Sequence, residues 1–389
     1  MQESLEMGVH MNKKQNWVII IWFLIMIFGI TAANLMNPDR EFSERENRVL
    51  EQKPDLAVSY FFSGAYSVDY EQYITDQFIQ RDNWIGVRTV LERVQLRQEI
   101  KDIYFAGDGY LIEKHTDTFG MDMAERNISC LADFMKEYLP IYGEEHITAM
   151  VVPNAVKVLE EKLPPYASPY DEGIYLRQIE EALPNGTWVD TLEVLKEHSD
   201  EELYYRTDHH FKTLAAYYIY DEWGKMTGLK PLDLADFEVK TVSDEFLGTL
   251  ESKVGGRFSG DSIQVFIPKE EYRYTLKYSN SEAVKHNLYE MSALETKDKY
   301  GIFFGGNHPF VEASIENGSM RKLLVIKDSY AHCFLPFAFL DFSEVDFVDL
   351  RYYNESLRGL MEKKEYTDVL FLYNAAGFAK DVNLGKLRN

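Results

Sequence analysis

The chain has 389 residues, of which 46% are hydrophobic and 14% aromatic, so it is long and apolar enough to bury a sizeable core and does not have the composition of a disordered protein. Its formal charge is -23 at pH 7, and no stripe of lysine and arginine with interleaved aromatics offsets this charge. Because such a surface repels phosphates, we exclude nucleic acid as the natural partner.

A membrane span is the first predicted element. The uncharged run WVIIIWFLIMIFGITAANLM, residues 17–36, is long enough to cross the ~30 Å hydrocarbon core of a bilayer. Lys13 and Lys14 precede the run and acidic residues follow it, so the positive-inside rule places residues 1–16 in the cytoplasm. A cleaved signal peptide is the alternative, but its apolar region is usually shorter. We therefore favour a single-pass anchor in the cell membrane, with the rest of the chain outside the cytoplasm.

A linker and a helical segment follow the anchor. Residues 37–64 mix proline, glutamate, arginine and serine without periodicity, which is typical of a juxtamembrane linker. Residues 65–100 place aromatics among charges at helical spacing, and they predict helices that lead into an extracytoplasmic domain over residues 65–389. Gly107-Asp108-Gly109 then separates two apolar pieces and predicts a hairpin, because glycine tolerates positive φ.

Strands and helices alternate beyond Met121, which predicts an α/β fold with a largely parallel sheet. Four short apolar runs are the predicted strands: residues 147–152, 323–326, 345–350 and 369–373. Residues 187–189 form a weaker candidate strand. Residues 233–310 are too irregular for us to predict elements there.

Polar residues follow the predicted strands, at the edge where open parallel sheets bind ligands. They are Asn154, Ser329, Arg351 and Asn374, which could supply a nucleophile, a cation and oxyanion donors. An arginine at a strand end more often forms a solvated salt bridge, so Arg351 also has that interpretation. Asn307, which follows two glycines, is another oxyanion candidate, and Tyr330 could stack on a sugar ring.

Ser329 lies at the turn between a predicted strand and a predicted helix in KLLVIKDSYAHCFLPF. Backbone N–H groups and the positive end of the helix dipole would stand close to its hydroxyl and could stabilise an oxyanion. The segment therefore predicts a nucleophile, with simple helix capping as the alternative. A glycine-x-serine-x-glycine elbow is absent from the sequence.

A second polar segment, YYRTDHHF, places Asp208 and His210 before a helix predicted to end near Met226. If Asp208 holds one ring nitrogen of His210 while the other nitrogen faces Ser329, the three residues form a Ser-His-Asp triad, which is recognised by roles and not by chain order. The alternatives to a catalytic role are that this segment only caps the helix and that its two histidines are surface residues.

Neither a metal site nor a disulfide is predicted. The Asp208–His210 segment could ligate an ion, but adjacent histidines rarely reach one ion, and only His308 and His332 could assist them. Cys130 and Cys333 are the two cysteines of the chain. A disulfide between them is compatible with an extracytoplasmic domain, but we favour two buried thiols because Cys333 lies in an apolar stretch.

Seven short segments form an ordered set along the chain: FSERENRVL (42–50), YEQYITDQFIQRDNW (70–84), GDGYLIE (107–113), VVPNAVKVLEEKLP (151–164), YYRTDHHF (204–211), FLGTLESKVG (246–255) and IKDSYAHCFLPF (326–337). Together they resemble the DHHW protein family, which is similar to the alginate O-acetylation proteins. The SGNH-hydrolase-like domain of those proteins carries an Asp-x-His motif upstream of the catalytic serine. The resemblance implies a three-layer α/β fold of the SGNH-hydrolase type.

By position, the resemblance implies Ser329 as the nucleophile and His210 with Asp208 as its acid–base pair. Two residues depart from the family pattern. Phe211 stands where the family name has tryptophan, and Lys327 replaces the glycine that precedes Asp-Ser in many SGNH enzymes. The first exchange keeps an aromatic ring, whereas the second changes the residue beside the expected oxyanion hole.

Two functions agree with these features. The first is a serine-dependent acyl, most simply acetyl, transferase or esterase that acts on a cell-surface polysaccharide through an acyl-enzyme and needs no cofactor. Because one span cannot carry cytoplasmic acyl groups across the membrane, the related systems imply a multi-span membrane acyltransferase as the acyl donor. The second is a non-catalytic glycan-binding or envelope-assembly protein on the same scaffold.

Overall fold

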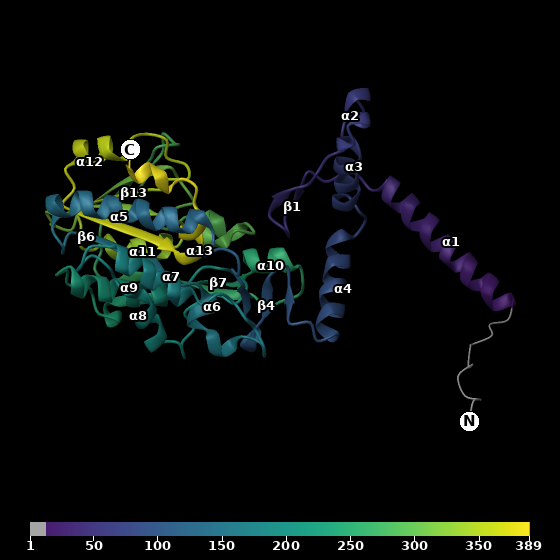
Figure 1. The fold of residues 1–389 in the computed structure, drawn as a ribbon, viewed down its shortest axis with the longest axis horizontal. Helices are drawn as coiled ribbons and strands as arrows, with labels where there is room; N and C mark the ends of the chain where they lie inside the picture. Colours follow the sequence, from purple (N-terminus) through teal and green to yellow (C-terminus); the bar gives the residue numbers. More distant parts are fainter. Residues whose placement is uncertain (1–12, 389) are drawn as a thin grey trace. The chain divides into compact units, whose positions relative to one another are not determined.

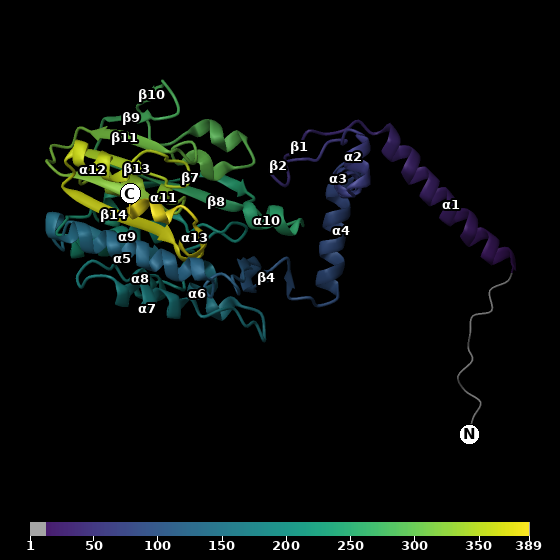
Figure 2. The ribbon, with the colours of Figure 1, turned by 45° about the horizontal axis from the view of Figure 1, so that its top comes forward.

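The computed structural model describes residues 13–388 and divides the chain into two compact units, Met1–Val90 and Leu91–Asn389. The division falls inside helix α4 (Arg81–Val94), within the segment predicted to be helical. The elements of the first unit that precede α4 are labelled in Figure 1, except for β2, which is labelled in Figure 2: α1 (Lys13–Met36), β1 (Phe42–Ser43), β2 (Arg48–Val49), α2 (Val58–Phe62) and α3 (Ala65–Asp76). By its length and composition, α1 is the one helix within residues 13–388 that could cross a membrane.

Ion pairs order the segment that follows α1. Asp76, at the end of α3, is buried and binds the Arg48 guanidinium at 2.6 Å, and the Glu51 amide donates to the same carboxylate at 2.9 Å. Arg81, at the start of α4, binds Glu46 at 2.8 Å. The hydrogen bond from Arg48 is the largest cause that lowers the pKa of Asp76 below its usual value. The charged residues of this linker therefore pair with fixed partners, which its lack of periodicity did not predict.

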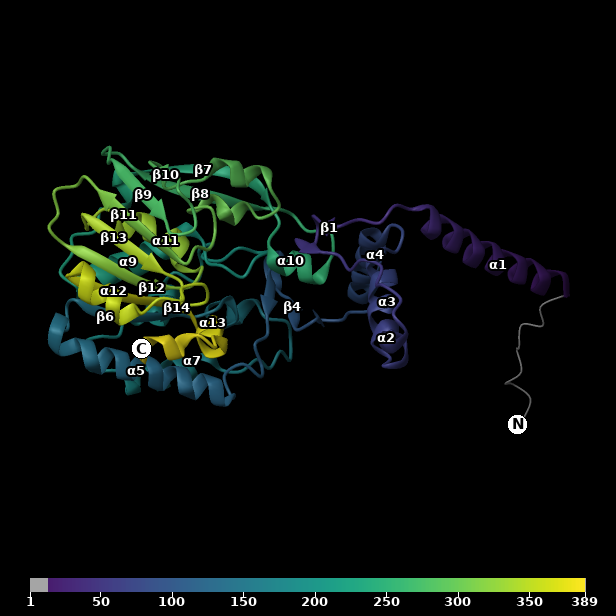
Figure 3. The same cartoon turned by 90° about the horizontal axis from the view of Figure 1, so that it is seen from above.

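The second unit is built around a seven-stranded sheet in the order β10-β9-β11-β13-β12-β14-β6, which can be followed in Figure 3. Its parallel part consists of β6 (Ile147–Val152), β12 (Lys322–Lys327), β13 (Glu344–Val348) and β14 (Asp368–Asn374). Three antiparallel strands extend one edge: β9 (Tyr274–Tyr278), β10 (Val284–Lys285) and β11 (Phe310–Ile315). The predicted α/β class and all four predicted strands are confirmed, although β13 ends two residues early. Residues 187–189 contribute only an isolated bridge, between Trp188 and Ala149.

Helices cover both faces of this sheet, so the unit has three layers. One face packs against α5 (Asp122–Tyr142), α7 (Glu172–Ala182), α12 (Leu357–Lys364) and α13 (Ala375–Lys380). The other face packs against α8 (Thr191–Glu197), α9 (Thr213–Met226) and α11 (Ala331–Ala338). Side chains of β14 alternate between the two cores, with Leu370 and Leu372 in one and Phe371 and Tyr373 in the other, as the strand period of two requires.

Smaller elements border the sheet. The predicted hairpin is confirmed: β3 (Glu99–Ile100), β4 (Ile103–Phe105) and β5 (Leu111–Glu113) pair antiparallel, and Asp108 and Gly109 in the turn have φ of 56° and 80°. The unpredicted region contains a long pair, β7 (Phe237–Phe246) and β8 (Asp261–Pro268), and α10 (Thr249–Val254) between them. Short α6 (Ala155–Val158) follows β6. Figure 2 shows α10 beside the ends of β7 and β8.

Candidate active site

Ser329 lies in the predicted turn between β12 and α11 and lines a cleft of about 530 Å³. The turn is held by Asp328, whose buried carboxylate accepts hydrogen bonds from the Tyr330 amide and the Asn374 amide, both at 2.9 Å. Burial raises the pKa of Asp328 to about 6. Because Asn374 ends β14, this carboxylate ties the serine turn to the neighbouring parallel strand.

The Asp208–His210 segment lies in a tight loop before α9, closed by a bridge between Tyr204 and Phe211. Asp261, at the start of β8, accepts hydrogen bonds from the backbone amide of Thr207 at 2.8 Å and from its hydroxyl at 2.6 Å. These bonds fix the loop against β8. His209 and His210 lie in this loop, directly before α9, as the sequence predicted.

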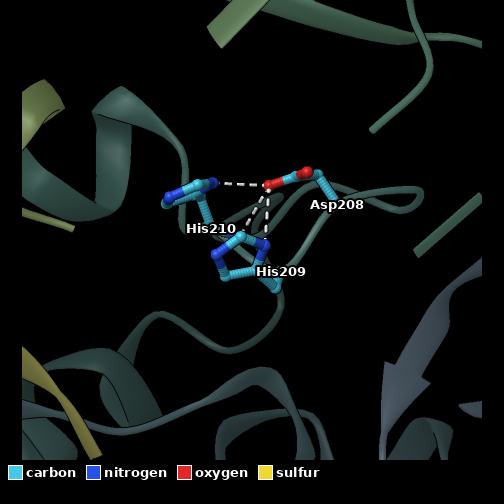
Figure 4. Close-up of side chains that lie close together, drawn as sticks. All are labelled: Asp208, His209 and His210. Carbon is cyan, nitrogen blue, oxygen red and sulfur yellow. Dashed lines mark hydrogen bonds and ion pairs between the residues drawn. The ribbon is translucent and has the colours of Figure 1, made fainter. Parts of the chain in front are cut away.

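The structure brings Ser329, His210 and Asp208 together. His210 Nε2 lies 2.8 Å from Ser329 Oγ, and His210 Nδ1 lies 2.6 Å from Asp208 Oδ1. The His210 amide also donates to Asp208 Oδ1, at 2.9 Å. Figure 4 shows the rings of His209 and His210 beside the Asp208 carboxylate. These distances, and the order serine, histidine and carboxylate, match the geometry of a Ser-His-Asp triad.

Asp208 is held in its ionised form. Burial by itself would raise its pKa, but the two neighbouring histidines and its hydrogen bonds outweigh burial, and the pKa lies well below the usual value. The second oxygen, Oδ2, accepts from the backbone amide of Thr249 at 2.7 Å and from its hydroxyl at 3.0 Å. The carboxylate is therefore rigid and can hold His210 in one orientation.

Gly248 is required at this contact. A Cβ atom added to Gly248 would lie 2.2 Å from the Cβ of Asp208, so any other residue would displace the carboxylate or α10. Gly248, Thr249 and Asp261 are thus supporting residues that the sequence reasoning did not identify. The glycine and threonine of the FLGTL segment could have suggested a turn before a short helix. Nothing in the sequence, however, indicated that this segment contacts Asp208.

Two N–H groups of cleft-lining residues, on Ser329 and Asn374, have hydrogens without an acceptor among residues 13–388. Among residues 13–388, the Ser329 amide has no hydrogen-bond partner, and Asn374 Nδ2 uses one hydrogen, donated to Asp328 at 2.6 Å. Asn154 Nδ2, in contrast, donates to Tyr330 Oη and to Asn374 Oδ1, at 3.1 and 3.3 Å. Both asparagines line the cleft, but only Asn374 Nδ2 keeps a hydrogen that no described residue accepts.

The remaining predicted site residues lie at the rim or in the core. Arg351 lines the cleft, but Asp349 binds its guanidinium through both oxygens, at 2.8 and 2.6 Å. Asn307 does not line the cleft, and its side-chain oxygen accepts from Arg351 at 3.3 Å. Tyr330 is fully buried and donates to the His209 carbonyl at 2.5 Å, so its ring joins the two site segments and does not face a sugar.

Both departures from the family pattern have a structural explanation. The Phe211 ring is fully buried and packs edge-on against Tyr330, with 4.8 Å between ring centroids, so the position keeps the aromatic ring of the family pattern. The Lys327 side chain does not line the cleft; its ammonium lies 2.7 Å from His332 Nε2 and 3.6 Å from Asp349. Burial lowers the pKa of Lys327 to about 8. Lysine is accommodated there without entering the space in front of Ser329.

The candidate metal ligands form hydrogen bonds to other side chains, and the cysteines are unpaired. The donor atoms of Asp208, His209 and His210 lie within 4.8 Å of one another, yet each is also hydrogen-bonded to Ser329 or Thr249. His332 binds Lys327, and His308 binds Asn280 and the Phe304 carbonyl. Cys130 and Cys333 are buried free thiols, which confirms the interpretation that we favoured.

Comparison with known proteins extends this description. A family model described as DHHW protein matches residues 175–348. The chain is similar to the crystal structure of a DHHW family protein from Eubacterium siraeum, with 24% identity and a TM-score of 0.62 over 75% of this chain and 96% of that chain. It is also similar to Bacillus cereus PatB1 with a sulfonyl adduct, with 20% identity and a TM-score of 0.59 over 72% and 98% of the two chains.

A weaker likeness, with 11% identity and a TM-score of 0.44 over 74% and 98% of the two chains, is to the O-acetyltransferase domain of Pseudomonas putida AlgJ. No curated protein matches the chain. The predicted resemblance to DHHW proteins is confirmed, and so is the predicted α/β fold class.

Proposed function

We propose that this chain, whose residues 175–348 match the DHHW family model, is a serine-dependent acyl transferase or esterase, most simply for acetyl groups, acting on a cell-surface polysaccharide. The observation that carries this proposal is the contact of 2.8 Å between His210 Nε2 and Ser329 Oγ, with Asp208 fixed behind the ring at 2.6 Å. A scaffold without catalysis has no need for an ionised aspartate, a histidine and a cleft-lining serine in this order. Hydrolysis of 4-nitrophenyl acetate by the purified chain, compared with its Ser329→Ala variant, tests the proposal.

In the proposed mechanism, His210 takes the proton of Ser329 as its Oγ attacks the acyl carbon. The oxyanion that forms accepts hydrogen bonds from the Ser329 amide and from the free hydrogen of Asn374 Nδ2. Asp208 stabilises the positive charge that develops on His210, and then His210 returns the proton to the leaving alcohol. Water or a sugar hydroxyl resolves the acyl-enzyme in the same way, so transfer and hydrolysis differ only in the acceptor.

The proposed location follows from α1 and the charges around it. We expect residues 17–36 to anchor the chain with residues 1–16 in the cytoplasm, because lysines precede the span and acidic residues follow it. A protease added to spheroplasts should therefore digest the large unit and spare an epitope placed before the span. Protection of the whole chain would show the opposite orientation, and release of the unit without added protease would indicate signal cleavage.

The proposed location also limits the acyl donor. A site outside the membrane has no access to cytoplasmic acyl-coenzyme A, so we propose that a multi-span membrane acyltransferase supplies the acyl group. The purified chain should hydrolyse 4-nitrophenyl acetate but should not acetylate a polysaccharide when acetyl-coenzyme A is the sole donor. Acetylation under those conditions, followed by mass spectrometry of the glycan, would refute the need for a separate donor protein.

A further inference from the structure

The cleft beside Ser329 contains a hydrogen-bond acceptor that the proposed triad does not use, the Nε2 atom of His209. The His209 ring lines the cleft, and 32% of its side chain is exposed. Its centroid lies 3.9 Å from that of His210, whose opposite face stacks on Tyr300 at 3.9 Å. His209 Nδ1 lies 2.8 Å from Thr249 Oγ1, whereas Nε2 has no hydrogen-bond partner in the described part of the chain.

The hydrogen bonds of Thr249 fix which nitrogen of His209 carries the proton. The hydroxyl of Thr249 has one hydrogen, and the ionised Asp208 carboxylate 3.0 Å away can only accept it. Thr249 Oγ1 must therefore accept from His209 Nδ1–H. Burial and the neighbouring His210 lower the pKa of His209 to about 4, so the ring is neutral at neutral pH. The lone pair of Nε2 is then left for a ligand in the cleft.

The other side chains of the cleft indicate which ligand this is. Asp381 also lines the cleft; its Oδ1 accepts from the backbone amide and the side chain of Asn383, at 2.8 and 2.9 Å, and its buried Oδ2 has no partner among residues 13–388. Because Asp381 Oδ2 has almost no exposed surface, the choice of ligand depends on His209 Nε2, which requires a ligand that donates a hydrogen bond, either a hydroxyl or an ammonium group. Lys253, Lys380 and Arg351 line the same cleft and balance the carboxylates of Glu113, Asp328 and Asp381, so the lining has no net charge that would attract an ammonium group. A neutral ligand rich in hydroxyls remains.

We propose that His209 forms the acceptor-hydroxyl site of this enzyme, where Nε2 binds one hydroxyl of a sugar or polyol while a neighbouring hydroxyl attacks the acyl group on Ser329. This inference rests on the proposed function. In this step the attacking oxygen bonds to the acyl carbon, and the bond from that carbon to Ser329 Oγ breaks. The proton of the attacking hydroxyl passes through His210 Nε2 to Ser329 Oγ. His209 transfers no proton in this step, because His210 contacts Ser329. Its ring lies beside the ring of His210, where it can orient the acceptor.

The test measures how the acetyl-enzyme formed from 4-nitrophenyl acetate partitions between water and an added alcohol. For the wild type, the ratio of transfer to hydrolysis should be larger with glycerol, which has neighbouring hydroxyls, than with methanol. The His209→Asn variant keeps an amide near the Nδ1 position but loses the Nε2 acceptor, so its glycerol ratio should fall about tenfold, the effect of one lost hydrogen bond. The His209→Gln variant places an amide oxygen near Nε2 and should keep most of the preference.

The matched control is His286→Asn, because His286 is exposed, binds the Tyr274 carbonyl and does not line the cleft. Its ratio should equal that of the wild type. An independent readout is the ¹⁵N chemical shift of the His209 ring in the wild type, which should identify a proton on Nδ1.

A glycerol preference that persists in His209→Asn, a wild type without any preference, or a proton on Nε2 would each overturn the acceptor site. These outcomes are distinct from failure of the proposed function, which would appear as a wild type that releases no more nitrophenol than its Ser329→Ala variant. The ratio is measured within each variant, so a change in total activity does not affect it.

Discussion

Replacing Ser329 with alanine is expected to lower kcat for 4-nitrophenyl acetate by about 10³-fold or more, the loss seen when a triad nucleophile is removed. The reason is that Ser329 Oγ lies 2.8 Å from His210 Nε2 and would form the acyl-enzyme of the proposed mechanism, whereas the proposed oxyanion donors alone should leave only a small residual rate. The measurement is the initial rate of nitrophenol release by the full chain in detergent. Circular dichroism of the same sample shows whether the variant is folded.

Ser281→Ala is the matched control for this substitution. Ser281 is exposed, its hydroxyl accepts a hydrogen bond from the Ala283 amide at 3.2 Å, and it does not line the cleft, so its loss should leave the rate unchanged. Phenylmethylsulfonyl fluoride should add one sulfonyl group to the wild type and none to Ser329→Ala, as measured by intact mass. Equal rates in the wild type and Ser329→Ala would instead favour the non-catalytic glycan-binding alternative.

The second large effect concerns the two adjacent histidines. His210→Ala should lose about 10³-fold or more of kcat, because it removes the group that takes the Ser329 proton. His209→Ala should lose no more than about tenfold for the same small ester, because its Nδ1 contacts Thr249 and its Nε2 does not contact Ser329. Initial rates with 4-nitrophenyl acetate separate the two variants. Similar losses in both would contradict the assignment of His210 as the base.

Chemical rescue gives this prediction a second readout. His210 is sandwiched between the rings of His209 and Tyr300, each with 3.9 Å between centroids, so His210→Gly should leave a slot with the shape of an imidazole ring. Added imidazole should then restore part of the esterase rate of His210→Gly. It should not restore the rate of Ser329→Ala, because that variant lacks the nucleophile. Failure of imidazole to raise the His210→Gly rate, in a folded sample, would argue against a role of His210 in proton transfer.

The sequence alone determined the features that depend on local pattern. The apolar run that becomes α1, the strands β6, β12 and β14, and the turn that carries Ser329 were predicted because hydrophobic periodicity and turn residues act over a few neighbours. The order of the short motifs also identified the DHHW resemblance before any contact was known. The region 233–310 was not predicted, because its strands are short, irregular or exposed along β7, and their partners lie far away in sequence.

Only the tertiary structure decided which of the candidate residues meet. Ser329 and His210 are separated by 119 positions, and the contact between them depends on how α9 and α11 pack on one face of the sheet. The contact of Thr249 with Asp208 spans 41 positions and arises in the region that could not be predicted. Likewise, the sequence proposed Asn154, Asn307 and Asn374 as oxyanion candidates without distinguishing them, and it left Arg351 as either a site residue or a salt bridge. Their hydrogen bonds distinguish them, because a polar group can stabilise an oxyanion only if its donors are not already bound to other side chains.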